Sequence, residues 1–443
     1  MTTLEKLKKY LEGIKKNDKQ GKKINAFLEL RPEKVLIDEA KKIDEKIKKG
    51  VAGKLAGKII SVKAVINVLG FHASCGSKTL EDYKSPYDAT AIRKVKDEDG
   101  LIIGMVNCDE FACGWSGETS AFGPTKNPHD LSLVAGGSSS GSVASVAANF
   151  CDLSLGTDTG GSIRVPSSHC GVVGVKPTYS SVSRYGLIDM CMSFDQIGPI
   201  AKNVRDAALL LSVIYGKDKH DSISQGNKKI NLKNIEKIPK NLTIGLIDFP
   251  ASDERIDELI NKKINLASEK YGWKIKKVKI PYIDLALATY YPIVYTEFFS
   301  GTRKFDGRRF GKRIEDTCGP EVLRRILGGR EISKAEHKGR YYNQALKVRR
   351  LLQKEFEKVF QEFDALVSFA VPRLPHKIGE KIGDEEMFFY DALTCPMNIV
   401  GNCAISLPIG KINNLPVGMQ IACDKFCDER MLQIANAIER LNE

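Results

Sequence analysis

The sequence predicts an α/β fold, and three features of the chain indicate it. Short apolar runs with the texture of buried strands recur from residue 57 to near the carboxyl end. Segments with helical periodicity separate many of these runs, and glycine- and serine-rich turns follow several of them. Such alternation is typical of a sheet covered by helices. A length of 443 residues is compatible with one large domain or with two or three smaller ones.

The N-terminal part, residues 1–50, is predicted to be helical. Leu4, Leu7, Leu11 and Ile14 recur at helical spacing among lysines, and residues 32–49 form a second run of this kind. We expect a helical segment, residues 1–50, packed on a main domain that comprises residues 51–443.

Residues 57–200 contain the first group of predicted strands. The apolar runs lie at 57–68, 100–107, 151–158 and 170–177, with a helix over residues 142–150. A second helix is predicted over 203–216, followed by a polar surface loop over 217–241. Apolar runs separated by glycine- and serine-rich segments are typical of the buried strands of a sheet and the turns that follow them.

The rest of the chain is predicted to complete the same sheet. Strands are expected at 242–248 and 273–281, with a helix over 253–271 between them. Residues 285–362 are mainly helical and strongly charged, three further strands follow at 365–372, 403–410 and 416–423, and a helix closes the chain at 429–441. Strands near both ends of the chain, with a helical stretch between them, indicate one sheet whose last strands come from the C-terminal part of the chain.

The composition disfavours a metal-binding, a membrane-spanning and a secreted protein. The 11 cysteines form no CxxC pair and the six histidines have no zinc-site spacing, so we expect reduced cysteines and no metal. No apolar run reaches the roughly 18 residues of a membrane helix, and no secretory signal is visible, which predicts a cytoplasmic protein. The net charge of +13 is compatible with a nucleic-acid partner, but the lysines are spread along the chain, so an evenly basic surface is the preferred explanation.

A first glycine- and serine-rich segment runs from Ala135 to Ser142. Three interpretations compete for it: a flexible linker, a phosphate-binding loop, and a turn that presents a serine and backbone N–H groups before a helix. A linker is disfavoured by the apolar runs on both sides. A Walker loop is excluded because no GK[ST] follows. The third interpretation suits oxyanion stabilisation.

A second such segment, Gly156–Pro166, reads GTDTGGSIRVP. Thr159, Gly160 and Gly161 precede Ser162, and N–H groups in such a turn can point at one developing oxyanion. Ser162 is therefore a candidate nucleophile. Asp158 and Arg164 are expected to brace the loop.

A nucleophilic serine needs a base. His169 is the nearest histidine in sequence, but no Gly-x-Ser-x-Gly elbow accompanies it. Lys63 is the alternative, because it interrupts the apolar run Ile59–Ile66. A lysine base must be neutral, hence desolvated and unpaired. From the residues alone, a solvent-facing Lys63 and a buried functional Lys63 stay equally open.

Taken together, Lys63, Gly136–Ser139 and Asp158–Pro166 resemble the signature of the amidase signature family, in both type and spacing. The resemblance implies one large domain with a mixed central sheet flanked by helices on both faces. It also implies a triad in which Ser162 attacks the amide, Ser138 on a cis peptide relays the proton, and neutral Lys63 accepts it.

Within this family, the chain looks most like the glutaminase subunits of tRNA-dependent amidotransferases. Further matching segments carry this resemblance: 24–27, 118–128, 170–178, 305–307, 321–326, 391–396 and 415–421. It implies that Tyr290, Arg325 and Asp391 hold free glutamine, with the arginine on the α-carboxylate and the aspartate on the α-ammonium. A register shifted by one residue puts Arg324 in place of Arg325.

The chain departs from the family pattern beside the base, where Lys63-Ala64-Val65 replaces the usual Lys-Asp-Asn. This removes polar groups near Lys63 and can alter activity. Two interpretations stay open: either Asn67 replaces these groups, or the site is drier than in the family. Ser140 and Val143 also replace smaller residues of the pattern. We expect these two changes to leave the triad itself intact.

The resemblance implies a glutamine amidohydrolase subunit that releases ammonia for amidation of Glu-tRNA(Gln), Asp-tRNA(Asn) or both. It implies a heterotrimer with a GatB-like subunit, which uses ATP and magnesium, and a GatC-like subunit, with tRNA reached through the complex. No cofactor is expected in this chain. Two alternatives stay open: a stand-alone amidase of a small amide, and a non-catalytic scaffold subunit.

Overall fold

The computed structural model describes residues 1–19, 23–226 and 229–441. Its centre is an eleven-stranded sheet with the order β1-β3-β2-β6-β8-β7-β12-β13-β11-β9-β10. The strands are β1 Phe27–Leu30, β2 Ile59–Lys63, β3 Leu101–Val106, β6 Leu153–Asp158, β7 Val173–Lys176, β8 Gln196–Ala201, β9 Thr243–Ile247, β10 Lys274–Val278, β11 Ala365–Phe369, β12 Cys403–Ile412 and β13 Leu415–Cys423. A separate hairpin pairs β4 Lys126–Asn127 with β5 Asp130–Val134.

The sheet is mixed, as the family resemblance implies. β2 pairs in parallel with β3 and β6, and β9 pairs in parallel with β10 and β11. The other neighbours are antiparallel, including the long pair β12 and β13. Most strands of the central part are buried along their whole length, which explains why they read as continuous apolar runs rather than as alternating ones.

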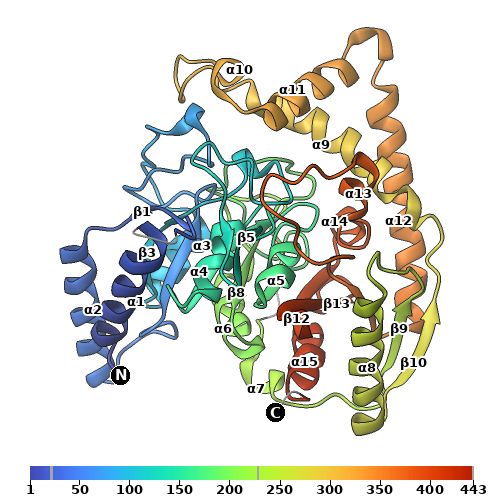
Figure 1. The fold of residues 1–443 in the computed structure, drawn as a ribbon, viewed down its shortest axis with the longest axis horizontal. Coiled ribbons are helices and arrows are strands. Elements are labelled where there is room, and N and C mark those ends of the chain that lie inside the picture. Colours follow the sequence, from blue (N-terminus) through green and yellow to red (C-terminus); the bar gives the residue numbers. More distant parts are fainter. Residues whose placement is uncertain (20–22, 227–228, 442–443) are drawn as a thin grey trace.

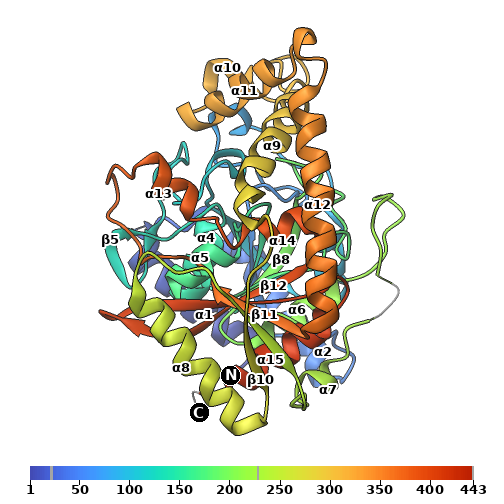
Figure 2. The same ribbon diagram turned by 90° about the vertical axis from the view of Figure 1, so that its right-hand side faces the viewer.

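Helices cover both faces of the sheet (Figure 2). The helices are α1 Thr3–Ile14, α2 Glu33–Lys48, α3 Thr90–Asp97, α4 Ser140–Ala147, α5 Arg164–Cys170, α6 Val204–Ile214, α7 Leu232–Ile235, α8 Glu254–Tyr271, α9 Ala286–Thr302, α10 Ile314–Thr317, α11 Pro320–Ile332, α12 Arg340–Glu362, α13 Asp384–Phe389, α14 Cys395–Val400 and α15 Asp428–Glu439. Helices α4 and α5 contact each other on one face, and α6, α8 and α15 lie on the other. A layer of α9, α11 and α12 extends beyond the sheet (Figure 1).

The N-terminal segment differs from the purely helical prediction. Its two predicted helices are present as α1 and α2, but β1 lies between them and pairs antiparallel with β3. Residues 27–30 are therefore an edge strand of the main sheet. A four-residue strand has too few alternating positions to stand out from the helical pattern around it. The boundary between residues 50 and 51 stays a prediction.

Several elements were not predicted from the sequence, namely α3, α5, α13, α14, the β4–β5 hairpin and β8. β8 lies between β6 and β7, and it contains a proline and a glycine, which are unusual within a strand. Helix α7 lies within residues 217–241, which were predicted to be a loop. The remaining predicted strands and helices are present in the described chain, and among its residues no helix combines the length and the apolar character that crossing a membrane requires.

Candidate active site

Lys63 is the last residue of β2 and is completely buried. Because β2 and β6 are parallel, with Val62 opposite Leu155, the carboxyl ends of both strands meet at the same edge of the sheet. This edge brings the Lys63 Nζ to 2.7 Å from the hydroxyl oxygen of Ser138 and 2.8 Å from that of Thr157. Of the two positions left open for Lys63 by the sequence, the structure has the buried one.

The hydrogen bonds around Lys63 determine which groups donate a proton and which accept one. Ser139 donates its hydroxyl proton to the carbonyl oxygen of Thr157, at 3.0 Å, so it can only accept from Lys63, whose Nζ lies 3.0 Å away. A neutral amine has two N–H donors and one lone pair. If Ser139 and Thr157 accept the two N–H bonds, the lone pair of Lys63 faces the hydroxyl of Ser138.

The surroundings of Lys63 favour its neutral form. Burial lowers the pKa of Lys63 to about 8, against the opposing influence of Cys108 and of the carboxylates of Asp109 and Asp158. Among the described residues, no carboxylate lies within ion-pair distance of the amine. Lys63 therefore has the desolvated, unpaired environment that a lysine base requires.

A backbone hydrogen bond connects the turn that carries Ser138 to the turn that carries Ser162. The Gly137–Ser138 peptide is cis, as the family resemblance implies. The backbone N–H of the next residue, Ser139, donates to the carbonyl oxygen of Ser162 at 3.1 Å. This bond ties the turn that carries Ser138 to the turn that carries Ser162, so Lys63, Ser138 and Ser162 belong to one site.

Ser162 lies in the turn between β6 and α5, and its residue is 8% exposed, which leaves the site open to a small substrate. Among the described residues, none accepts a hydrogen bond from the backbone N–H groups of Gly160, Gly161 or Ser162. Consecutive unpaired N–H groups in a turn can bind a developing oxyanion. The arrangement suits nucleophilic attack by Ser162 on a carbonyl group.

An ion pair within the protein holds this turn. Arg164 binds Asp158 at 2.9 and 3.0 Å, both side chains are fully buried, and Arg164 also donates to the carbonyl of Thr394. Burial raises the pKa of Asp158, but the charge and hydrogen bonds of Arg164 outweigh it and lower that pKa to about 2. The bracing role predicted for Asp158 and Arg164 is confirmed.

Two of the three residues expected to bind glutamine, Tyr290 and Asp391, lie beside this turn. A Cβ added at Gly160 would lie 2.9 Å from the hydroxyl of Tyr290, and one added at Gly161 would lie 3.1 Å from a carboxylate oxygen of Asp391. Glycine is therefore needed at both positions for close approach. Arg325, on α11, is 6% exposed and is electrostatically coupled to both Tyr290 and Asp391.

Arg324 and Arg325 point in different directions. Arg325 contacts Glu321 at 2.7 Å and Met190 Sδ at 3.5 Å in the interior, whereas the side chain of Arg324 is 45% exposed and binds the hydroxyl of Tyr295. The geometry therefore favours Arg325 over Arg324 at the site.

Asp391 has an unusual titration. Burial, together with the nearby Asp158 carboxylate, raises the pKa of Asp391 to about 7. Arg164 and Arg325 act in the opposite direction. A carboxyl group whose pKa is raised in this way is stabilised as the anion when an ammonium group binds beside it.

Several polar residues of the site were not singled out from the sequence. Ser139 and Thr157 accept the N–H bonds of Lys63, as described above. Asp195 accepts from the hydroxyl of Thr159 at 2.7 Å and from the N–H groups of Met190 and Cys191. Thr394 is fully buried beside Gly161 and Asp391. Ser139 was part of a recognised motif, but nothing local in the sequence marks Asp195 or Thr394.

Two residues considered from the sequence do not take the roles proposed for them. Asn67 does not replace the missing polar groups beside Lys63, because its amide donates to the hydroxyl of Tyr87 and the contacts of Lys63 are the hydroxyls of Ser138, Ser139 and Thr157. His169 is buried and lacks a hydrogen-bond partner on Nε2 among the described residues. Burial lowers the pKa of His169 to about 3.

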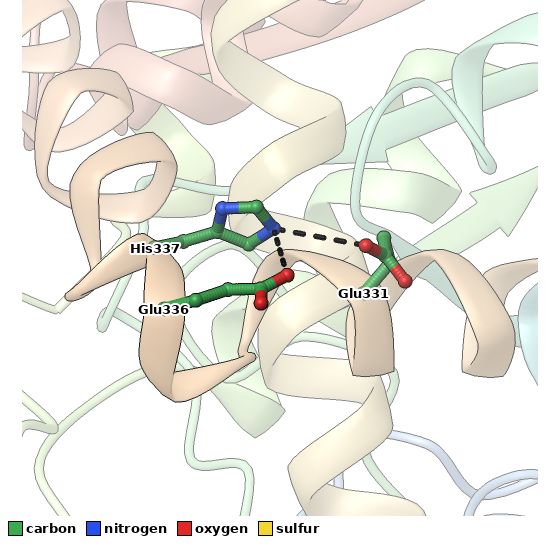
Figure 3. Close-up of side chains that lie close together, drawn as sticks. All are labelled: Glu331, Glu336 and His337. Carbon is green, nitrogen blue, oxygen red and sulfur yellow. Dashed lines mark ion pairs between the residues drawn. The ribbon is translucent and has the colours of Figure 1, made fainter.

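One cluster of possible metal ligands lies away from this site. Glu331, Glu336 and His337 approach one another at the junction between α11 and α12 (Figure 3). The two carboxylates lie 3.7 and 3.9 Å from His337 Nε2, and Glu331 is already paired with Lys334 at 2.6 Å. The cluster is largely exposed and explained by these ion pairs. That the chain holds no metal stays a prediction.

The fold and the residues gathered at this site are those of an amidase. The Amidase family model matches residues 7–432, and the chain belongs to this family. It is 52% identical to the A subunit of the glutamyl-tRNA(Gln) amidotransferase of Methanocaldococcus jannaschii, over 99% of this chain and 100% of the relative. It is 50% identical to the protein of the same name from Methanothermobacter thermautotrophicus, over 95% of this chain and 92% of that relative.

Solved structures agree with this family. The crystal structure of the A subunit of glutamyl-tRNA(Gln) amidotransferase from Thermotoga maritima has a TM-score of 0.84 and 38% identity, and covers 99% of this chain and 94% of its own. The peptide amidase from Stenotrophomonas maltophilia has a TM-score of 0.88 and 26% identity, over 100% of this chain and 94% of its own. The fold is thus shared by enzymes with different amide substrates.

Proposed function

We propose that this chain is the glutamine-hydrolysing A subunit of a tRNA-dependent amidotransferase, and that Ser162, Ser138 and Lys63 carry out the hydrolysis. The observation that carries the chemistry is the unpaired, buried amine of Lys63 at 2.7 Å from Ser138. The choice of glutamine is supported by the relatives named above, by Tyr290 and Asp391 beside the Gly160–Gly161 turn, and by the buried Arg325, whose charge acts on both residues.

In the first half of the reaction, the Ser162 hydroxyl attacks the side-chain carbonyl of glutamine. Its proton passes to Ser138, whose own proton moves to the lone pair of Lys63. The oxygen of the tetrahedral intermediate is bound by the free N–H groups of the turn that includes Thr159, Gly160 and Gly161. The C–N bond then breaks, and the proton returns through Ser138 to the leaving nitrogen, which departs as ammonia.

In the second half, water attacks the acyl-enzyme ester. The same relay removes a proton from the water and returns one to Ser162, so that glutamate is released. The net reaction consumes glutamine and water and yields glutamate and ammonia. No cofactor of this chain takes part in any step.

Substrate selection follows from the charges around the turn. Arg325 pairs with the α-carboxylate of glutamine, and Asp391 pairs with its α-ammonium group, while Tyr290 lies over the turn. Arg325 is held in place by Glu321, with a N–O distance of 2.7 Å. An amide without both α-groups loses at least one of these two charged contacts, which disfavours its binding.

The proposed assembly contains a GatB-like subunit that activates mischarged tRNA with ATP and magnesium, and a GatC-like subunit. This chain supplies only ammonia. The proposal that it belongs to a complex is supported by the names of its relatives, which designate them as one subunit of an amidotransferase. A cytoplasmic location fits this role in translation.

The test is amidation of Glu-tRNA(Gln) and of Asp-tRNA(Asn) by the chain co-expressed with its GatB-like and GatC-like subunits. We expect glutamine to support amidation, and the Ser162→Ala variant to lose this while ammonium chloride still supports it. Hydrolysis of simple amides without any use of glutamine would favour a stand-alone amidase instead. Glutamine-dependent amidation that persists in Ser162→Ala would favour a scaffold role.

A further inference from the structure

The loop between α9 and α10, residues 303–313, is strongly basic. Four of its six cationic side chains are neutralised by nearby carboxylates: Arg303 by Glu315, Lys304 by Asp189, Lys312 by Glu81, and Arg313 by Glu315 and Asp316. The two others, Arg308 and Arg309, are exposed. Among the described residues, no carboxylate pairs with either guanidinium group.

The loop holds these two arginines on a defined support. Asp306 and Arg313 form an antiparallel bridge, and Ile314 N–H donates to the carbonyl of Phe305 at 3.1 Å. The backbone N–H of Lys312 donates to the carbonyl oxygen of Thr79 at 2.8 Å, and this bond anchors the loop to the segment that contains Thr79. Arg308 and Arg309 thus lie between the two paired ends of an anchored loop. The helices α9 and α10 that this loop joins lie at the upper edge of the molecule (Figure 1).

A small pocket opens beside this loop. It has a volume of about 150 Å³, and its lining includes Tyr83, Tyr87, Leu187, Ile188, Phe305 and Phe310. Phe310 follows the two arginines directly and is 45% exposed. Asn67 and Lys304 also line this pocket, so its wall combines aromatic and polar side chains. A space of about 150 Å³ accommodates one group of the size of a benzene ring.

Exposed apolar side chains continue beyond the pocket. The rings of Tyr87 and Tyr185 lie 5.4 Å apart, and His220 stacks on Tyr185 at 4.7 Å. Tyr87 and Tyr185 are each 36% exposed. Clusters of exposed aromatic residues with arginine are enriched at protein interfaces and often supply most of the binding energy.

We propose that the Arg308–Phe310 segment and this pocket form a docking surface for an acidic segment of another subunit. The inference rests on the proposed function, because it takes the partner to be a subunit of the amidotransferase. One apolar or aromatic side chain of that segment fills the pocket. Its carboxylates pair with Arg308 and Arg309, which have no other anionic partner in the described chain.

The charge pattern favours a protein over an RNA partner at this surface. RNA affinity depends on neutralising several phosphates along a basic surface. Here most cations of the loop are already paired, and the two free ones directly precede Phe310, whose ring lines the pocket. A short acidic segment with one apolar anchor satisfies both features together.

The test measures binding of the full-length chain to the co-expressed pair of GatB-like and GatC-like subunits, by biolayer interferometry. The Arg308→Glu/Arg309→Glu variant and the Phe310→Ala variant are each expected to bind at least about 10-fold more weakly, as for central interface residues. Binding of the wild type, but not of the double arginine variant, should weaken steeply as salt is raised.

The matched control is Lys8→Glu/Lys9→Glu, which changes the net charge equally on α1, far from the loop (Figure 1). We expect this control to bind as the wild type does. Unchanged subunit binding by both loop variants overturns the docking surface, and so does a loss of tRNA binding with unchanged subunit binding. Glutamine-dependent amidation by the wild-type complex tests the proposed function separately.

Discussion

The amine of Lys63 and the hydroxyl of Ser138 lie 2.7 Å apart in a part of the protein from which water is excluded. The two groups come from different strand–turn units, and the parallel pairing of β2 with β6 brings them together. When the amine is neutral and donates its two N–H bonds to Ser139 and Thr157, its lone pair is directed at Ser138. Most of the following predictions depend on this relationship.

Replacing Lys63 by methionine removes the base and keeps the volume and apolar stem of the side chain. Glutamine hydrolysis should fall by about 10²- to 10⁴-fold, the usual contribution of a general base. The measurement is ammonia release per folded enzyme. Amidation supported by ammonium chloride should be kept.

The matched control for Lys63→Met is Lys176→Met. Lys176 is also buried, and burial lowers its pKa to about 8, but its amine donates to the carbonyl of Pro177 instead of contacting a serine of the site. This variant should lose stability and keep its turnover. If both variants lose turnover to the same extent, the base assignment is wrong.

The activity should depend on pH through Lys63 and Asp391. Lys63 acts as the neutral amine, and its pKa is lowered to about 8, so the active fraction grows as pH rises through 8. Asp391 binds the ammonium group as an anion, and its pKa is raised to about 7, so glutamine binding improves as pH rises through 7. We expect kcat/KM, which reports the free enzyme, to rise across both values and then level off.

The Asp391→Asn variant separates the two titrations. It should bind glutamine more weakly at every pH and should retain the rise near pH 8 while losing that near 7. A flat profile in the wild type between pH 7 and pH 9, about one unit above the Lys63 pKa, would contradict the assignment of Lys63.

Arg325 and Arg324 offer a test within one helical turn. Arg325→Met should raise KM for glutamine roughly 10- to 100-fold, because a charged hydrogen bond to the α-carboxylate contributes about 1.5–3 kcal/mol. Arg324→Met removes the same charge from an exposed position and should leave KM nearly unchanged. Steady-state kinetics of both variants decide the register, and the opposite order would assign the role to Arg324.

Gly161→Ala should impair the oxyanion turn. Gly161 has φ +148°, and a Cβ there would lie 2.5 Å from Thr394 Oγ1. The turn must shift, which we expect to lower kcat by about 10²- to 10³-fold, as the loss of one oxyanion donor does. Gly383→Ala is the control, since a Cβ at Gly383 meets no atom within 4 Å. Single-turnover kinetics should show slow acylation in Gly161→Ala alone.

Arg164→Met should affect stability before chemistry. It leaves the buried carboxylate of Asp158 without its charged partner, which typically costs about 3–5 kcal/mol. The free energy of unfolding from urea titration measures this cost. A variant Asp158→Asn/Arg164→Met, which removes both charges, should recover part of the loss. A single variant as stable as the wild type would show that Arg164 does not hold the turn.

Local sequence patterns were sufficient for most of the fold. β2, β3, β6, β12 and β13 are apolar over most of their length, and α8 and α12 have clear helical periodicity. β1 and β8 were not recognised, because β1 is only four residues long and β8 contains glycine and proline. Their identity as strands depends on the partners with which they pair.

Some residues of the candidate site could likewise be recognised from the sequence, and others could not. The signature residues Lys63, Ser138 and Ser162 were found in the sequence because their residue types and spacing match one family pattern. Asp195 and Thr394 were missed, because an isolated aspartate or threonine has no local feature that distinguishes a buried functional group from an exposed one. Asn67 was assigned wrongly for the same reason, since proximity to Lys63 along the chain did not place its side chain near the amine.

The sequence by itself determined the α/β class, which depends on local periodicity, and the proposed nucleophile Ser162 with its proposed triad, which depend on motifs with fixed spacing. Only the tertiary structure decided that Lys63 is buried without a carboxylate partner, that Arg325 rather than Arg324 points into the interior, and that Ser139 and Thr157 surround the amine. These properties arise from desolvation and from contacts between segments far apart along the chain.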